Sequence, residues 1–237
     1  MATKTTTHAD TVDIHQGDQG RHSRAAGITA IVAAGTMLIG TAFWVASGTD
    51  LEAALEGDTI GEYLTDVAAN STLVTANLGF WILGVILLGL GGIMLSTLGD
   101  QDSPATAVAR FAFTAGPAAS IVFFSVWLGM VLGLAPAFVA GDQVEAVALA
   151  LGHAISIADW FATALILSLG GAALAVAGRH TWVPRWLFRW AMLSAVLGVL
   201  GIVGLIVDAL ATLAFAIVPV GIGFMIAAGI TALRHDA

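Results

Sequence analysis

The sequence predicts an all-α fold, a polytopic membrane protein built as a bundle of six transmembrane helices. Hydrophobic residues make up 58% of the chain and charged residues 10%, and the mean hydropathy of +0.94 lies outside the range of soluble globular domains. The apolar residues gather in six runs, each long enough to cross a hydrocarbon layer of about 30 Å. The basic residues fall in alternate connections between these runs, as a membrane topology requires.

The first 24 residues are polar and hold too little apolar surface to fold alone, so we expect residues 1–24 to form a disordered cytoplasmic tail. Scattered His and Asp residues on such a tail lack the fixed geometry of a metal site, and we predict none. The transmembrane domain then covers residues 25–234. Its expected spans are 25–47, 74–98, 109–134, 148–178, 187–207 and 211–233.

The first apolar run has a second possible interpretation, as a cleaved signal peptide. Arg21 and Arg24 precede an apolar run that ends at Val45-Ala46-Ser47, a pattern that a cleaved signal peptide also shows. The length of this run favours a membrane helix. Residues 48–72 then form an acidic external segment, which we expect to fold as a short amphipathic helix.

Glycine is abundant in the spans, and small residues let membrane helices approach closely. The second span is especially rich in glycine. In the third span, Gly129 and Gly133 are spaced for a close helix contact, and we favour an internal contact over a dimer interface.

Orientation follows from the eight basic residues, because six spans place alternate connections on opposite sides. They are Lys4, Arg21, Arg24, Arg110, Arg179, Arg185, Arg189 and Arg234. All of them fall on one side, whereas the connections on the other side carry only acids. The positive-inside rule therefore places both termini in the cytoplasm, for a multi-pass protein of a prokaryotic cytoplasmic (inner) membrane.

The fourth span contains the best functional candidates. It is the only apolar run with an acid well inside it. At about 100° per residue, a polar stripe occupies about one third of the helix circumference. The stripe consists of His153, Ser156, Asp159 and Thr163, together with Trp160. Ionisable side chains inside a membrane are costly unless they face water, a partner or the bundle interior, which makes them functional candidates.

Two readings of this stripe remain open. In one, it forms a proton or cation relay or a polar ligand pocket. In the other, His153 lies in the outer interface and Asp159 hydrogen-bonds a neighbouring helix to fix its packing. Asn77 and Asp208 are further contributors to consider: Asn77 stands at the start of the second span, and Asp208 is more simply a loop acid at the outer end.

Several activities lack sequence support. The chain contains no cysteine, no phosphate-binding loop and no hydrolase or metalloprotease motif, so we predict neither an enzyme nor a metal site. We predict no cofactor, because a haem bound in a helix bundle usually needs two axial ligands and only His153 falls inside a span. With few basic residues, the chain offers no nucleic-acid surface. The seven tryptophans divide between interface and core, and the sequence shows no paired aromatic cage.

From about Asn70 onward the layout resembles a family of uncharacterised six-span membrane proteins of bacteria and archaea, defined only as a domain of unknown function. The residues that carry the resemblance are Asn70, Asn77, Ile157-Ala158-Asp159, Leu169-Gly170-Gly171, Gly178-Arg179, Val183-Pro184-Arg185-Trp186-Leu187 and Leu197-Gly198-Val199-Leu200-Gly201. The resemblance implies the six-span topology and no activity.

Two functions from different classes follow. The first is a non-enzymatic accessory, structural or sensory membrane protein, whose polar stripe holds helices together. The second is a small transporter or channel that moves a proton, cation or small solute along the stripe. The expected partners are the lipid bilayer and other membrane proteins or a second copy of the chain. A dry, packed stripe would favour the first function, and a water-accessible cavity would favour the second.

Overall fold

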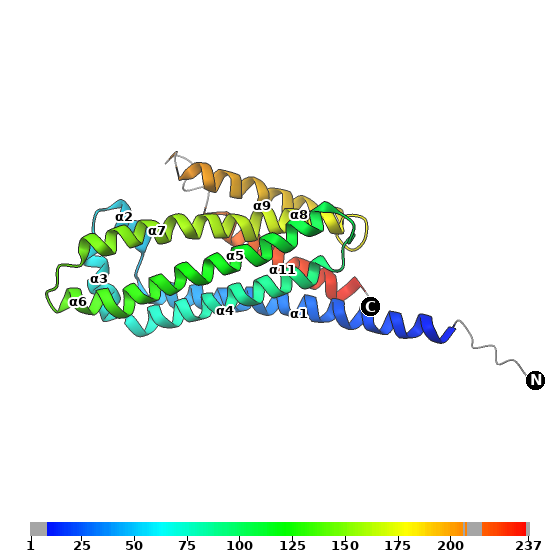
Figure 1. Cartoon of the computed structure of the whole chain (residues 1–237), viewed down its shortest axis with the longest axis horizontal. Coiled ribbons are helices and arrows are strands. Elements are labelled where there is room, and N and C mark those ends of the chain that lie inside the picture. The colour runs from blue at the N-terminus through cyan, green and yellow to red at the C-terminus, as the bar shows by residue number, and fades with distance from the viewer. Residues whose placement is uncertain (1–8, 206, 208–214, 236–237) are drawn as a thin grey trace, which may run out of the picture.

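The computed structural model describes residues 9–205, 207 and 215–235, and every regular element within them is helical. Six helical segments are long and apolar enough to cross a membrane (Figure 1). They are Gly20–Ser47, Ser71–Ser96, Pro104–Val139, Glu145–Gly178, Arg185–Gly204 and Ile217–His235. The all-α class and the six-span bundle predicted from the sequence are thereby confirmed.

The spans divide into the following elements, in chain order. They are α1 (Ala9–Ser47), α4 (Ser71–Ser96), α5 (Pro104–Gly129), η1 (Met130–Leu134), α6 (Ala135–Val139), α7 (Glu145–Thr163), η2 (Ala164–Gly170), α8 (Gly171–Gly178), α9 (Arg185–Gly204) and α11 (Ile217–His235). Helix α1 begins at Ala9, well before the expected start at residue 25, so part of the segment expected as a tail continues the first helix.

Two of the spans are not continuous α-helices. The third span contains the π-helical segment η1, and the fourth contains η2. For the fourth span, the sequence predicts one continuous membrane helix, and η2 departs from that prediction. A π-helix is a rare, wider helix with i→i+5 hydrogen bonds that is frequently found at functional sites. Segment η2 follows Thr163 directly, so it begins where the polar stripe ends.

The external segment folds as two short helices, α2 (Leu51–Glu56) and α3 (Ile60–Ala69), where one was expected. Asp50 caps α2 by accepting a hydrogen bond from the backbone N–H of Ala53 at 3.2 Å. Helix α3 buries Tyr63 and Leu64 against the end of the bundle. The acidic segment is thus a packed cover over one end of the spans.

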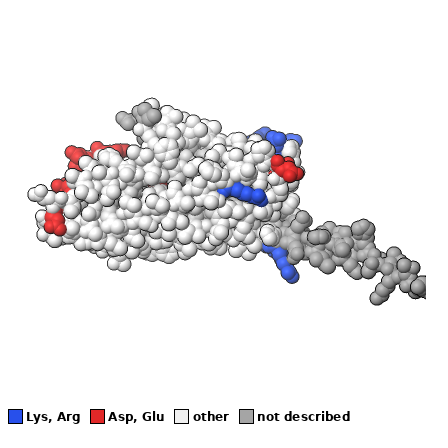
Figure 2. All heavy atoms as spheres, in the orientation of Figure 1, with Lys and Arg blue, Asp and Glu red and all other residues white. Residues whose placement is uncertain are grey.

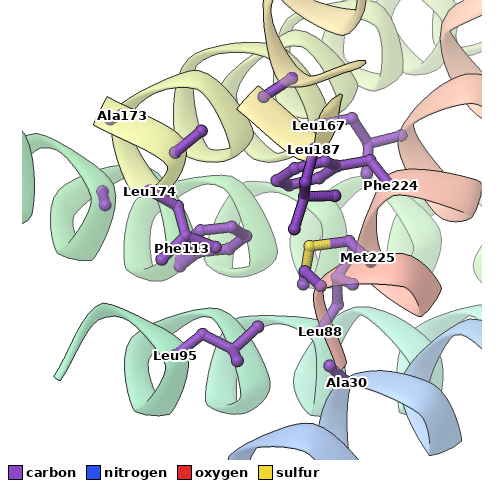
Figure 3. Packing of buried hydrophobic residues seen from close by; sticks show 14 of the residues in the cluster. Ala30, Leu88, Leu95, Phe113, Leu167, Ala173, Leu174, Leu187, Phe224 and Met225 are labelled. Carbon is purple, nitrogen blue, oxygen red and sulfur yellow. The ribbon is translucent and has the colours of Figure 1, made fainter. Parts of the chain in front are cut away.

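Residues from all six spans meet in one apolar core near the other end of the bundle (Figure 3). Phe113 of α5, Leu174 of α8 and Leu95 of α4 are almost fully buried there. Close packing depends on glycine: a Cβ at Gly92 would lie 2.3 Å from the Phe113 ring. This use of glycine agrees with the packing expected for membrane helices.

The predicted internal contact at Gly129 and Gly133 is wrong. A Cβ added at either position meets no atom of the described residues within 4 Å. Both glycines are exposed on the outside of the bundle. The close approaches lie elsewhere, for example between Gly27 of α1 and Gly229 of α11, where a Cβ at Gly27 would lie 2.6 Å from the Gly229 carbonyl oxygen.

Charge is segregated along the bundle (Figure 2). Acids gather at the end that carries α2 and α3, and arginines gather at the opposite end, where α1 starts and α11 finishes (Figure 1). Asp100 and Asp102, in the connection between α4 and α5, share the arginine-bearing end. The acidic cover and the polar stripe of the fourth span therefore lie toward the same end of the molecule.

Candidate functional site

A cavity of about 270 Å³ lies among the spans at the acidic end of the bundle. It is lined by residues of α1, α2, α4, α5 and α7 and by two residues at the start of the last span. These residues are Thr41, Trp44, Asp50, Leu51, Glu52, Trp81, Trp127, Ile155, Ser156, Asp159, Trp160, Thr163, Phe215 and Val218. Most of this surface is apolar, and the polar groups are concentrated on α2 and α7.

The polar stripe of the fourth span forms one wall of this cavity. Ser156, Asp159 and Thr163 all line it, as does Trp160. The Thr163 hydroxyl donates to Asp159 Oδ1 at 3.3 Å, one turn along the same helix. Asp159 is half-buried, and no other hydrogen bond to its carboxyl group occurs within the described ranges. The hydrogen bond from Asp159 to a neighbouring helix, which the packing interpretation predicts, is therefore absent from the part of the chain that the structure describes.

Glu52 supplies a second carboxyl group to the cavity. Helix α2 folds over the end of α7 and places Glu52 near Ser156 and within electrostatic range of Asp159. Burial raises the pKa of Glu52 above its ordinary value. A hydrogen bond from Ser156 opposes the rise, the charges of Asp50 and Glu56 add to it, and His153 opposes it. Glu52 had been expected only as one acid among many in an external segment.

Three sequence candidates lie elsewhere. His153 is exposed and does not line the cavity, although it is close enough to Glu52 to affect its pKa. Asn77 is buried, and its Nδ2 donates to the Gly40 carbonyl at 2.9 Å, which ties α4 to α1. It is a packing residue and takes no part in the cavity wall. Asp208 lies outside the described residues.

Tryptophans from four helices line the same cavity, which the sequence analysis did not anticipate. Trp44 comes from α1, Trp81 from α4, Trp127 from α5 and Trp160 from α7. The ring centroids of Trp44 and Trp81 are 6.5 Å apart, and those of Trp81 and Trp127 are 6.1 Å apart. Periodicity within each span cannot show that tryptophans of four spans converge at one depth.

The wall is fixed in part by the cover. Trp127 Nε1 donates to the Tyr63 hydroxyl at 2.8 Å, and both side chains are buried. Burial raises the pKa of Tyr63 above its ordinary value, so the phenol stays neutral. Helix α3, which lies outside the membrane spans, thereby fixes the position of the Trp127 indole in the cavity wall.

The fourth span is packed beyond Thr163. Ile166, Leu167 and Ser168 of η2 are buried, and the Ser168 hydroxyl donates to the Ser194 carbonyl of α9 at 2.7 Å. In return, the Ser194 hydroxyl donates to the Leu167 carbonyl at 2.9 Å. These reciprocal bonds satisfy carbonyl and hydroxyl groups at the π-helical segment. The cavity-facing polar residues of the fourth span thus end where η2 begins, and buried residues packed against other helices follow them.

No family model, curated protein or solved structure matches the chain. Within the described residues, no group of three or more His, Asp or Glu side chains is placed to hold a metal ion. The geometry of the site combines three carboxyl groups, those of Asp50, Glu52 and Asp159, with a largely aromatic and apolar wall.

Proposed function

We propose that the protein is a non-enzymatic, solute-binding membrane protein of the sensory or accessory class, which recognises a small cationic solute in the cavity beside Asp159. The observation that carries the proposal is the position of Asp159, half-buried in a span and facing open space without a basic partner among the described residues. A carboxyl group in that setting is costly unless water or a cation reaches it. Ser156, Thr163 and Glu52 supply further polar groups at the same wall.

We further propose that the protein lies in a prokaryotic cytoplasmic membrane, with both termini in the cytoplasm and the cavity toward the outside. The segregation of arginines and acids at opposite ends of the bundle supports this orientation (Figure 2). The acids of α2 and α3 then attract cations toward the mouth of the cavity. A solute would reach Asp159 from the external side.

Transport is the second candidate function, and segment η2 favours it. A π-helical segment directly after the binding wall gives the fourth span a place where its hydrogen-bond pattern can change. In the structure, the buried residues of η2 close the way toward the arginine-bearing end. Movement of a solute across the membrane would require this packing to open, whereas recognition alone would not.

The absence of cysteine from the natural sequence makes accessibility a clean test. Ser156→Cys and Thr163→Cys would each be treated in intact cells with two membrane-impermeant thiol reagents, one cationic and one anionic. Asp66→Cys, exposed on α3, is the positive control, and Ser120→Cys, buried in α5, is the negative control.

We expect both cavity cysteines to react from outside, and to react faster with the cationic than with the anionic reagent, because the cavity wall is acidic. Asp66→Cys should react readily and Ser120→Cys should not. Failure of both cavity cysteines to react, with Asp66→Cys labelled, would refute solute access. Equal rates with the two reagents would refute the preference for cations.

A further inference from the structure

The cavity has an aromatic wall built from separate parts of the chain. Trp44, Trp81, Trp127 and Trp160 reach it from four different helices. The planes of Trp44 and Trp81 are inclined by 41°, and those of Trp81 and Trp127 by 58°, so the rings do not stack flat on one another. Trp160 packs edge-on against Phe215, with centroids 5.2 Å apart. Inclined rings around one space can contact one solute from several directions.

The carboxyl groups of the cavity have no lysine or arginine beside them in the described part of the cavity wall. Glu52 and Asp159 both line the cavity, whereas no lysine or arginine among the described residues does. Their charges lie close enough to interact. A cation that enters the cavity would relieve this repulsion. The cavity therefore places carboxyl groups and indole rings, whose faces carry partial negative charge, beside the same occupant.

An inorganic ion fits this wall poorly. Hard cations such as Ca²⁺ and Mg²⁺ take about six or more oxygen ligands, and the described residues contain no cluster of acids arranged for a metal. The wall is instead dominated by indoles and by apolar side chains such as Ile155 and Leu51. Such a surface suits a cation whose charge is surrounded by carbon. Tryptophan is the side chain that attracts these cations most strongly.

We infer that the cavity is an aromatic cage for an organic ammonium ion, with Trp44, Trp81, Trp127 and Trp160 around its alkyl groups and Asp159 and Glu52 as its counter-charges. This inference rests on the proposed function and names the class of solute. The volume of about 270 Å³ limits the ligand to a small molecule. The ammonium group would be bound chiefly through its charge and its alkyl surface.

The test compares choline with its uncharged carbon isostere, 3,3-dimethylbutan-1-ol, on the purified full-length protein in lipid nanodiscs. Binding would be measured by isothermal titration calorimetry at constant ionic strength, with sodium and potassium chloride as further probes. We expect choline to bind at least about tenfold more tightly than the isostere, a difference of about 1.4 kcal/mol, because only choline can make cation–π contacts with the desolvated rings. The inorganic cations should not compete at matched ionic strength.

Substitutions at Trp160 show whether an aromatic ring is needed. Trp160→Phe should weaken choline binding less than Trp160→Leu, because phenylalanine keeps a weaker ring quadrupole and leucine has none. Trp186→Leu is the matched control, since Trp186 is 52% exposed and lies outside the cavity. It should leave affinity unchanged. Thermal unfolding of each variant identifies those that fail to fold, and Trp44→Phe with Trp44→Leu repeats the comparison on another helix.

Each outcome decides the inference. Equal binding of choline and its isostere would overturn the cage in favour of a plain apolar pocket. Binding of sodium or potassium, measured directly by calorimetry, without binding of choline would overturn it in favour of an inorganic cation site, and would leave the proposed function standing. If the cavity cysteines described above also fail to react, the proposed function fails with it. Equal effects of Trp160→Phe and Trp160→Leu would likewise overturn the cation–π argument.

Discussion

Trp127 Nε1 donates a buried hydrogen bond to the Tyr63 hydroxyl at 2.8 Å, across 64 positions of sequence. The bond joins a cavity-lining residue of the third span to the external helix α3. Removal of the Tyr63 hydroxyl would leave the indole N–H buried without an acceptor. We expect Tyr63→Phe to lower the free energy of unfolding by about 1–3 kcal/mol. Equilibrium denaturation in detergent micelles measures this loss.

A double-mutant cycle separates the bond from the rest of the packing. Trp127→Phe and Tyr63→Phe should together cost less than the sum of the two single changes, because the second change removes a group that the first left unpaired. Additive losses would show that the hydrogen bond contributes nothing of its own. Weaker choline binding by Tyr63→Phe would further show that the cover positions the cavity wall.

The charge of Asp159 should decide cation binding. Asp159→Asn keeps the size of the side chain and a partner for Thr163 but removes the charge. We expect at least about a tenfold loss of choline affinity, the effect of one charge in a partly desolvated site. Asp66→Asn removes an exposed external acid and should change affinity less than twofold, about the effect of a screened surface charge. Unchanged binding by a folded Asp159→Asn protein would remove Asp159 from the site.

Binding should depend on pH through Glu52. Burial raises the pKa of Glu52, so its carboxylate forms at a higher pH than that of an ordinary glutamate. Cation affinity should rise with pH across this interval, and the free energy of unfolding should fall there, because the unfolded chain releases the proton at a lower pH than the folded chain. Asp50, Glu56, His153 and Asp159 also face Glu52, so the informative quantity is the difference from Glu52→Gln.

In Glu52→Gln, the part of both pH profiles that belongs to Glu52 should vanish while the remainder persists. Titration calorimetry between acidic and neutral pH measures the affinity, and chemical denaturation over the same range measures stability. Identical profiles for the two proteins would mean that Glu52 neither titrates in this interval nor contributes charge to the cavity.

Gly198 on α9 permits the reciprocal bonds between Ser168 and Ser194. A Cβ at Gly198 would lie 1.8 Å from Ser168 Oγ. Gly198→Ala should therefore lower the free energy of unfolding by about 1–3 kcal/mol through displacement of η2 from α9. Gly129→Ala is the control, because nothing described lies near its Cβ and alanine favours the helix by up to about 1 kcal/mol. Equal stability of the two variants would contradict this packing.

Asn77 should affect stability without affecting binding. Its amide donates to the Gly40 carbonyl, and hydrogen bonds between membrane helices contribute about 0.6 kcal/mol on average and up to about 1.7 kcal/mol. We expect Asn77→Leu to lower the free energy of unfolding by an amount in this range, measured by denaturation. Choline affinity should remain within about twofold, which corresponds to less than about 0.5 kcal/mol, because Asn77 does not line the cavity. A loss of binding in a stable Asn77→Leu protein would bring Asn77 back as a site residue.

The length and apolar composition of the runs predicted the number of spans, because the bilayer requires about 20 apolar residues for each crossing helix. Helical periodicity predicted the polar stripe on the fourth span. It placed Ser156, Asp159 and Thr163 on one face, and the structure agrees because the fourth span is regular α-helix up to Thr163. His153 does not line the cavity, although Trp160 does at nearly the same angle on the helix, about 20° away. His153 lies two turns nearer the start of α7, so its position along the helix axis separates it from the cavity.

The rest of the site depends on contacts between distant segments. Glu52 reaches the cavity only because α2 folds back over α7, and an acidic external segment gives no sign of that fold. The convergence of Trp44, Trp81 and Trp127 depends on the vertical register of three helices. The residue pattern within one helix does not predict how that helix is positioned along its axis relative to its neighbours. The outward position of Gly129 and Gly133 was missed for the same reason, since a small-residue spacing does not say which way it faces.

The π-helical segment η2 also affects how related sequences should be compared. Its hydrogen bonds run from i to i+5, so each hydrogen-bonded loop encloses one residue more than the corresponding loop of an α-helix. A protein with one residue fewer between Ala164 and Gly170 would keep the same faces on α7 and α8 with an ordinary α-helix in between. An alignment gap at this point of the membrane span would then mark a preserved structure, although gaps usually indicate surface loops.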